Sequence, residues 1–161
     1  MNTAAAHAST DLVTVAYHGA RAVQTGFRAS TDDWQPMLFF TTADGRRHIT
    51  AVAHTNQQKD ATANAVTALL QRHRAVEALW LASAWEVTPD ATDSDPAAIR
   101  PSRDPRRREI LFLVHVGKDF AAAHRAPIRR HRKGAPTLGD LTESHWHIDG
   151  LMSTALRRGI G

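Results

Sequence analysis

The sequence predicts an α+β domain in which an antiparallel or mixed sheet of about five strands carries two to three packed helices. Three observations lead to this prediction. Apolar runs of strand length follow one another and are separated by tight turns. Two other segments space their apolar residues as one face of a helix does. The regular alternation of strands and helices that a doubly wound parallel sheet requires is missing.

Length and composition are those of a single domain spanning residues 1–161. A chain of this length can bury a substantial core, and a hydrophobic content of 42% argues against global disorder. Cysteine is absent, which excludes disulfides, thiolate metal sites and cysteine catalysis. No apolar run is long enough to span a membrane and no secretory leader is recognisable, so we expect a cytoplasmic protein.

Two helices and a hairpin are predicted in the first half of the chain. Residues 10–27 show helical spacing of apolar side chains, and residues 60–73 show it again. Between them, residues 36–42 and 46–54 are rich in β-prone side chains and flank the dipeptide Asp44-Gly45. Asp-Gly between two such runs is typical of a tight β-hairpin.

Three further strands are predicted from apolar runs in the second half. Residues 75–87 form a nearly continuous apolar run, which we interpret as a central strand covered on both faces. Residues 109–116 are a second such run, and a turn separates them from an alternating pattern over residues 120–128. Because apolar runs must bury their surface together, we expect these three segments to be neighbours in one sheet.

Two segments of the second half lack a strand pattern. Residues 88–108 are rich in Asp and Pro and have no apolar periodicity, so they predict a long surface loop. Residues 129–161 form a basic C-terminal segment that closes with a short helix, in which Asp149 is the candidate N-cap and Gly159 the stop.

Charge divides the chain near residue 100. Residues 1–99 hold seven Arg or Lys against ten Asp or Glu, whereas residues 100–161 hold thirteen against six. A basic cluster dominates the second part, and its members are Arg125, Arg129, Arg130, Arg132 and Lys133. This asymmetry predicts a basic face for an acidic protein partner or for a second copy of the chain.

The same cluster leaves two other interpretations open. Guanidinium groups suit phosphate oxygens, so residues 125–133 are also candidates for contacts with nucleic acid. Against this, no aromatic residue for base stacking lies in residues 124–133, and no nucleic-acid-binding module is recognisable. Charge on a solvated sheet edge explains the cluster equally well. If the cluster lies on the surface, as a binding face or as a solvated sheet edge, we expect that changing Arg129, Arg130 and Arg132 to Ala leaves folding intact.

A His-x-His pair near the C-terminus suggests a metal site. In an extended segment His145 and His147 point to the same side, which is a spacing that metal ligands use. Asp149 or Asp140 could complete the site, and Glu143 could serve as base for metal-bound water. The alternative is a surface turn whose tryptophan is buried. The metal interpretation predicts a metal-dependent hydrolase.

Carboxylates and tryptophans around the long loop carry structural predictions. Glu86 follows a buried run, and we expect it or Glu109 to form an ion pair with one of the arginines at 106–108 and to pin the loop to the sheet. The four tryptophans are expected in the core, except that Trp34 could cover a ligand cleft or a subunit contact.

One segment resembles a known set of proteins. Trp85-Glu86 ends a predicted strand, and Pro101 to Glu109 then read P-S-x-x-P-x-R-x-E, with Pro-Thr-Leu-Gly at residues 136–139. This pattern resembles that of small uncharacterised bacterial and phage-borne proteins. The resemblance implies an α+β fold and no activity.

Catalysis has no positive signature in the sequence. Gly-rich phosphate loops, G-x-S-x-G elbows and nucleotide fingerprints are missing from it. We therefore expect a non-catalytic binding or assembly module without a cofactor, with the nucleic-acid protein and the hydrolase as alternatives.

Overall fold

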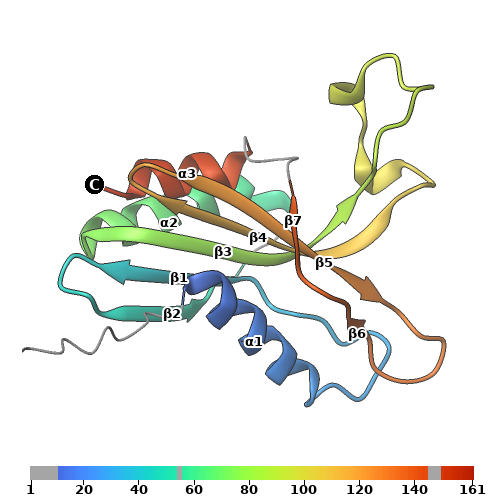
Figure 1. Cartoon of the computed structure of the whole chain (residues 1–161), viewed down its shortest axis with the longest axis horizontal. Helices are drawn as coiled ribbons and strands as arrows, with labels where there is room; N and C mark the ends of the chain where they lie inside the picture. The colour runs from blue at the N-terminus through green and yellow to red at the C-terminus, as the bar shows by residue number, and fades with distance from the viewer. Residues whose placement is uncertain (1–10, 54–55, 145–149) are drawn as a thin grey trace, which may run out of the picture.

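The computed structural model describes residues 11–53, 56–144 and 150–161, shown in Figure 1. Its helices are α1 (Leu12–Gln24), α2 (Lys59–Arg72) and α3 (Leu151–Gly159). Its strands are β1 (Met37–Thr42), β2 (Arg47–Ala51), β3 (Ala75–Glu86), β4 (Arg108–Gly117), β5 (Ala121–Arg129), β6 (Thr137–Leu138) and β7 (Thr142–Ser144). Short 3₁₀ turns lie at Asn56–Gln58, Pro96–Ala98 and Pro101–Arg103.

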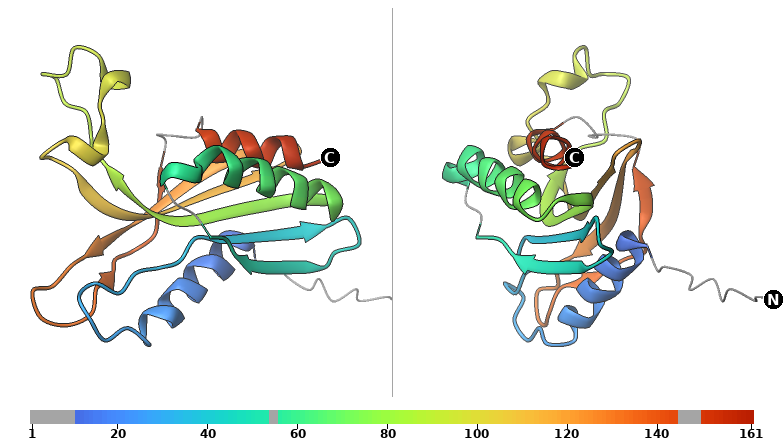
Figure 2. Two further views of the ribbon diagram at one scale, coloured as in Figure 1. Left: turned by 180° about the vertical axis from the view of Figure 1, so that it is seen from behind. Right: turned by 90° about the vertical axis from the view of Figure 1, so that its left-hand side faces the viewer.

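The strands form one curled antiparallel sheet in the order β2-β1-β3-β4-β5-β6, with β7 paired to β5 (Figure 2). The predicted α+β class is confirmed, and so is the adjacency of β3, β4 and β5. The sheet is larger than the predicted five strands, because β6 and β7 lie in the segment predicted as a basic tail. Strands of two and three residues are too short to leave a period-2 pattern in the sequence.

Helices cover both faces of the sheet, as Figure 1 shows. On one face Leu79 and Leu81 of β3 belong to the hydrophobic cluster of α1. On the other face Ala78 and Trp80 belong to the cluster of α2 and α3. Successive strand side chains point to opposite faces. Residues 78–81 of this apolar run are therefore buried on both faces, as the sequence predicted, whereas Val76 and Trp85 nearer the ends of the strand are exposed.

The first helix begins at a side-chain cap and fixes the segment that follows it. The Asp11 carboxylate accepts hydrogen bonds from the backbone N–H of Val13 (2.8 Å) and Thr14 (3.2 Å). The indole N–H of Trp34 donates to the carbonyl of Ala20 at 2.8 Å. Trp34 is only 3% exposed and belongs to the core, and it also lines a concavity with Trp80 and Trp85, so its role at a cleft or a subunit contact stays a prediction.

Helices α2 and α3 pack on each other above the second cluster. The Thr67 hydroxyl donates to the carbonyl of Ala155 at 2.9 Å, and Gly159 lies against Leu70. A Cβ atom on Gly159 would be 2.6 Å from the Leu70 Cβ, so the approach requires glycine. Within the described ranges, no helix combines the length and the apolar character needed to cross a bilayer.

Candidate functional site

The predicted basic cluster is divided between two faces of the sheet. Side chains alternate between the two faces along β5, so Arg125 and Arg129 lie on the same face as α2 and α3. The two helices cover that face farther along the sheet. Arg130 follows β5 and reaches Glu109 on the α1 face. Arg132 and Lys133 are exposed in the turn between β5 and β6. The cluster is therefore not one continuous basic surface.

Arg130 has a structural role. Its guanidinium binds the Glu109 carboxylate at 2.6 Å and 3.0 Å and lies 3.2 Å from a carboxylate oxygen of Asp33. It also donates to the carbonyl of Ser30 at 3.1 Å. These contacts tie the segment between α1 and β1 to β4. Arg130 is therefore a structural contact as well as a member of the cluster, and the effect of changing it to Ala on folding stays a prediction.

Arg125 neutralises a buried carboxylate. Glu86 is only 7% exposed, and its carboxylate forms an ion pair with the Arg125 guanidinium. The sequence prediction assigned Glu86 and Glu109 to the arginines at 106–108, and the structure contradicts both pairings. Sequence proximity suggested the loop arginines, whereas the antiparallel pairing of β3, β4 and β5 brings Arg125 and Arg130 to these carboxylates.

The three consecutive loop arginines have three different environments. Arg106 binds Asp90 (3.0 Å), Asp93 (2.9 Å) and Asp104 (2.8 Å), all within the loop. Hydrogen bonds from Arg106 hold the pKa of the Asp93 and Asp104 carboxyls below its ordinary value of 3.8. The Arg107 guanidinium stacks 4.8 Å from the ring centre of Trp85. The loop is thus held together by its own charges.

The third arginine of this run, Arg108, lines a groove that we call the arginine groove. It has a volume of about 500 Å³, and its walls are Glu86, Thr88, Arg108, Ile110, Arg125, Pro127, Arg129, Thr137, Leu138, Gly139, Asp140 and Thr142. Arg108 and Arg129 are exposed, and among residues 11–53, 56–144 and 150–161 neither side chain has an ion-pair partner. Two guanidinium groups are therefore available to a ligand in this groove.

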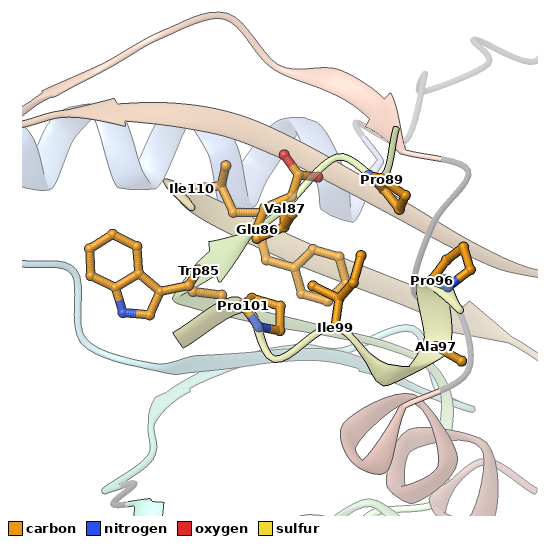
Figure 3. A pocket seen from close by; sticks show the side chains of 11 residues that line it. Trp85, Glu86, Val87, Pro89, Pro96, Ala97, Ile99, Pro101 and Ile110 are labelled. Atoms are coloured by element: carbon orange, nitrogen blue, oxygen red, sulfur yellow. The ribbon is translucent and has the colours of Figure 1, made fainter. Parts of the chain in front are cut away.

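An apolar cavity, which we call the loop cavity, lies beside the arginine groove. Figure 3 shows it between the long loop and the ends of β3 and β4, with Trp85 toward one end and Ala97 toward the other. Its volume is about 580 Å³, and its walls are Ala84, Trp85, Glu86, Val87, Pro89, Pro96, Ala97, Ile99, Pro101, Ile110 and Phe112. Glu86 and Ile110 line both concavities, so the loop cavity and the arginine groove adjoin.

Sequence reasoning missed two residues of this region. The sequence predicts Arg108 as a possible partner of Glu86, whereas period-2 alternation with Ile110 on β4 places it on the same face as Arg129. Trp85 was expected in the core but is 45% exposed. The position of Trp85 could not be predicted, because it depends on β1 ending its pairing with β3 at Leu81.

Acid–base candidates gather on the opposite face, near the start of α1. The His115 Nε2 atom lies 2.6 Å from a carboxylate oxygen of Glu77, and His124 lies opposite Glu143 across the β5–β7 pair. The His124 Nδ1 atom is buried without a hydrogen-bond partner in the described part of the chain. Burial lowers the pKa of His124, while the nearby Glu143 carboxylate acts in the opposite direction.

The predicted metal ligands His145, His147 and Asp149 lie outside the described residues. Of their suggested helpers, Asp140 lines the arginine groove and Glu143 lies on β7, so the structure does not bring these two to one site. Within the described ranges, no three His, Asp or Glu side chains are grouped so that they could hold a metal ion. The metal site stays a prediction.

Comparisons with known proteins return no relative of this chain. Neither the family models, nor the curated proteins, nor the solved structures contain a match. The resemblance of the segment around Trp85 and Pro101–Glu109 to small bacterial and phage-borne proteins therefore stays a prediction.

Proposed function

We propose that the chain is a non-catalytic binding module that holds an acidic protein partner in the arginine groove. One observation carries this proposal: Arg108 and Arg129 line one concavity and lack ion-pair partners among the described residues. A guanidinium group donates two parallel hydrogen bonds to a carboxylate, so two such groups favour a ligand with at least two carboxylates. Arg125 remains paired with Glu86 and positions the groove wall.

The composition of the groove favours an acidic protein over a nucleic acid. No Phe, Tyr or Trp is among the groove residues, so bases would have no side chain to stack on. Arg130 is engaged on the other face of the sheet, which interrupts the row of positive charge that a phosphate backbone would follow. A short acidic segment needs only the few charges that the groove offers.

Assembly and location form part of the same proposal. The partner could be a second copy of the chain, since residues 1–99 carry more acidic than basic side chains. We propose that residues 1–161 act as one domain in the cytoplasm, and the absence of cysteine suits that reducing compartment. Sedimentation of the purified chain measures whether the groove mediates self-association.

The test is a salt series with a labelled polyglutamate peptide and a labelled single-stranded oligonucleotide of equal charge. Binding is followed by fluorescence anisotropy for the wild type and for the double variant R108Q/R129Q. The matched control, R72Q/R158Q, removes two exposed arginines from the last turns of α2 and α3. We expect R108Q/R129Q to weaken polyglutamate binding about two- to thirtyfold, since exposed ion pairs contribute roughly 0.2–1 kcal/mol each.

Two results would contradict the proposal. If both double variants weaken binding equally, only net charge matters and the groove is not a site. If the oligonucleotide binds more tightly than polyglutamate, with a steeper salt dependence, the nucleic-acid alternative is correct. The hydrolase alternative is tested separately by metal analysis of the purified chain, with H145A/H147A as its control.

A further inference from the structure

The loop cavity has the size and lining of a site for an apolar group. Its volume of about 580 Å³ is within the usual range for ligand sites, roughly 300–1,000 Å³. Carbon-rich side chains form almost all of its wall, including three prolines contributed by the long loop. An apolar group placed there would leave water for a largely apolar surface, which is favourable.

The wall of the loop cavity offers no free charge. Glu86 is its one ionisable member, and in Figure 3 the Glu86 carboxylate points away from Ile99 and Pro101. Arg125 neutralises that carboxylate from β5. The guanidinium groups of Arg108 and Arg129, which have no ion-pair partner in the described residues, lie in the adjoining arginine groove, which shares Glu86 and Ile110 with the cavity. The two concavities are chemically distinct and adjacent.

The loop that closes the cavity is organised independently of any ligand. Arg106 binds Asp90, Asp93 and Asp104, and the Asp95 side chain accepts a hydrogen bond from the backbone N–H of Ala97 at 3.1 Å. A wall that is already ordered costs less conformational entropy when a ligand binds. The loop cavity therefore resembles a preformed binding pocket.

We propose that the loop cavity binds one bulky apolar side chain, such as Trp, Phe or Leu, of an acidic partner that is a separate protein and not a second copy of the chain. This inference rests on the proposed function, because the carboxylates of the same segment bind Arg108 and Arg129. The recognised partner is thus an acidic segment with an apolar anchor, rather than any acidic protein. The arginines attract acidic segments to the groove, and the apolar anchor determines which of these segments bind tightly.

The experiment uses three labelled peptides of equal length and the full chain. The first is acidic and contains one Trp, the second has Ser in place of that Trp, and the third keeps Trp but has Gln for every Glu. We expect the first peptide to bind about 30-fold more tightly than the second, the scale at which a buried aromatic anchor contributes. We expect the third peptide to bind weakly.

Two variants localise the effect of the anchor. Ile99→Ser shortens a cavity wall residue in the loop, and Ala98→Ser is its matched control because Ala98 is exposed on the neighbouring position and does not line the cavity. We expect Ile99→Ser to remove most of the preference for the Trp peptide over the Ser peptide. Ala98→Ser should retain that preference in full.

The outcomes separate this inference from the proposed function. If the Trp and Ser peptides bind equally well and both respond to R108Q/R129Q, the anchor inference is wrong and the groove proposal stands. If the Trp peptide responds to Ile99→Ser but not to R108Q/R129Q or salt, the groove proposal is wrong. If the uncharged Trp peptide binds as tightly as the acidic Trp peptide, charge does not contribute to binding and the proposal of a combined site is wrong. Dissociation of a dimer by Ile99→Ser identifies a second copy as the occupant and also overturns the inference.

Discussion

The Glu86 carboxylate is buried at the end of β3, and its positive partner, Arg125, comes from β5, two strands away. Glu86 lines both the arginine groove and the loop cavity, and Arg125 lines the groove beside it. A buried carboxylate is tolerated only while a positive group or hydrogen bonds compensate for its lost hydration. Arg125 is therefore a structural residue that also forms part of the proposed binding surface.

Removal of Arg125 should destabilise the fold. Arg125→Ala leaves the Glu86 carboxylate buried without its partner, and the expected loss is about 3 kcal/mol in the free energy of unfolding. Arg129→Ala is the matched control, because Arg129 is exposed and its loss should change stability by less than about 0.5 kcal/mol. Urea denaturation measures both values. Equal stability of the two variants would show that Glu86 does not depend on Arg125.

The loop should loosen when Arg106 is removed. Arg106→Gln breaks the contacts to Asp90, Asp93 and Asp104, so trypsin should cut after Arg103 several-fold faster than in the wild type. The substitution itself removes a cleavage site, so faster cleavage reports loop opening. Arg72→Gln serves as control. An unchanged cleavage pattern would mean that the loop is held by something other than its charges.

The same contacts predict how the loop responds to acid. Because Arg106 holds the pKa of Asp93 and Asp104 below 3.8, their stabilising effect is fully present above pH 3.8 and is lost as pH falls through the lowered values. Fluorescence of Trp85, which lies at the base of the loop, should therefore be constant above pH 3.8 and change below it. A Trp85→Phe variant identifies the contribution of this tryptophan. A change in the Trp85 signal near neutral pH would contradict the assignment.

Helix packing predicts opposite effects for two glycine substitutions. Gly159→Ala places a methyl group 2.6 Å from the Leu70 Cβ, and overpacking of this kind costs about 1–3 kcal/mol. Gly19→Ala, in the exposed middle of α1, meets nothing within 4 Å and should stabilise the fold by about 0.5–1 kcal/mol. Thermal unfolding measures both changes. Equal shifts of Tm would contradict the close contact between α2 and α3.

His124 should contribute a pH dependence of stability. Its folded pKa lies below the ordinary value of 6.5, chiefly because of burial, so the unfolded chain takes up the proton first as pH falls. Its contribution is therefore fully present above pH 6.5 and decreases as pH falls toward the lowered pKa, by at most about 1.4 kcal/mol per pH unit. NMR titration of the His124 ring checks the sign. A midpoint at or above 6.5 would refute it.

The sequence contained most of the sheet but little of the candidate site. The long apolar run of β3 and the hairpin at Asp44-Gly45 are local patterns, and both were predicted with nearly correct bounds. The partners of Glu86 and Glu109 depend on which strands are neighbours and in which register. Such long-range pairings leave no local pattern, so the sequence indicated the nearest arginines instead of Arg125 and Arg130.

Alternation within strands could have revealed more. Once residues 120–128 were predicted as a strand, Arg125 and Arg129 had to share one face, and the next residue, Arg130, had to turn to the other. The adjacency of these charges in the sequence nevertheless predicts one surface. Short elements set the other limit, since β6 and β7 have too few residues to show a period.

Glu86 and Arg108, where the long loop leaves and rejoins the sheet, are paired directly across β3 and β4. A segment whose two ends meet at one point of a scaffold can vary in length and composition without shifting the strand register, and longer versions add little closure entropy. Residues 88–107 can thus be exchanged as one unit, whereas Val87 is only 5% exposed and belongs to the core. Recognition in such a protein can diversify by replacing this unit alone, and an engineer can graft new segments there while the rest of the molecule is left untouched.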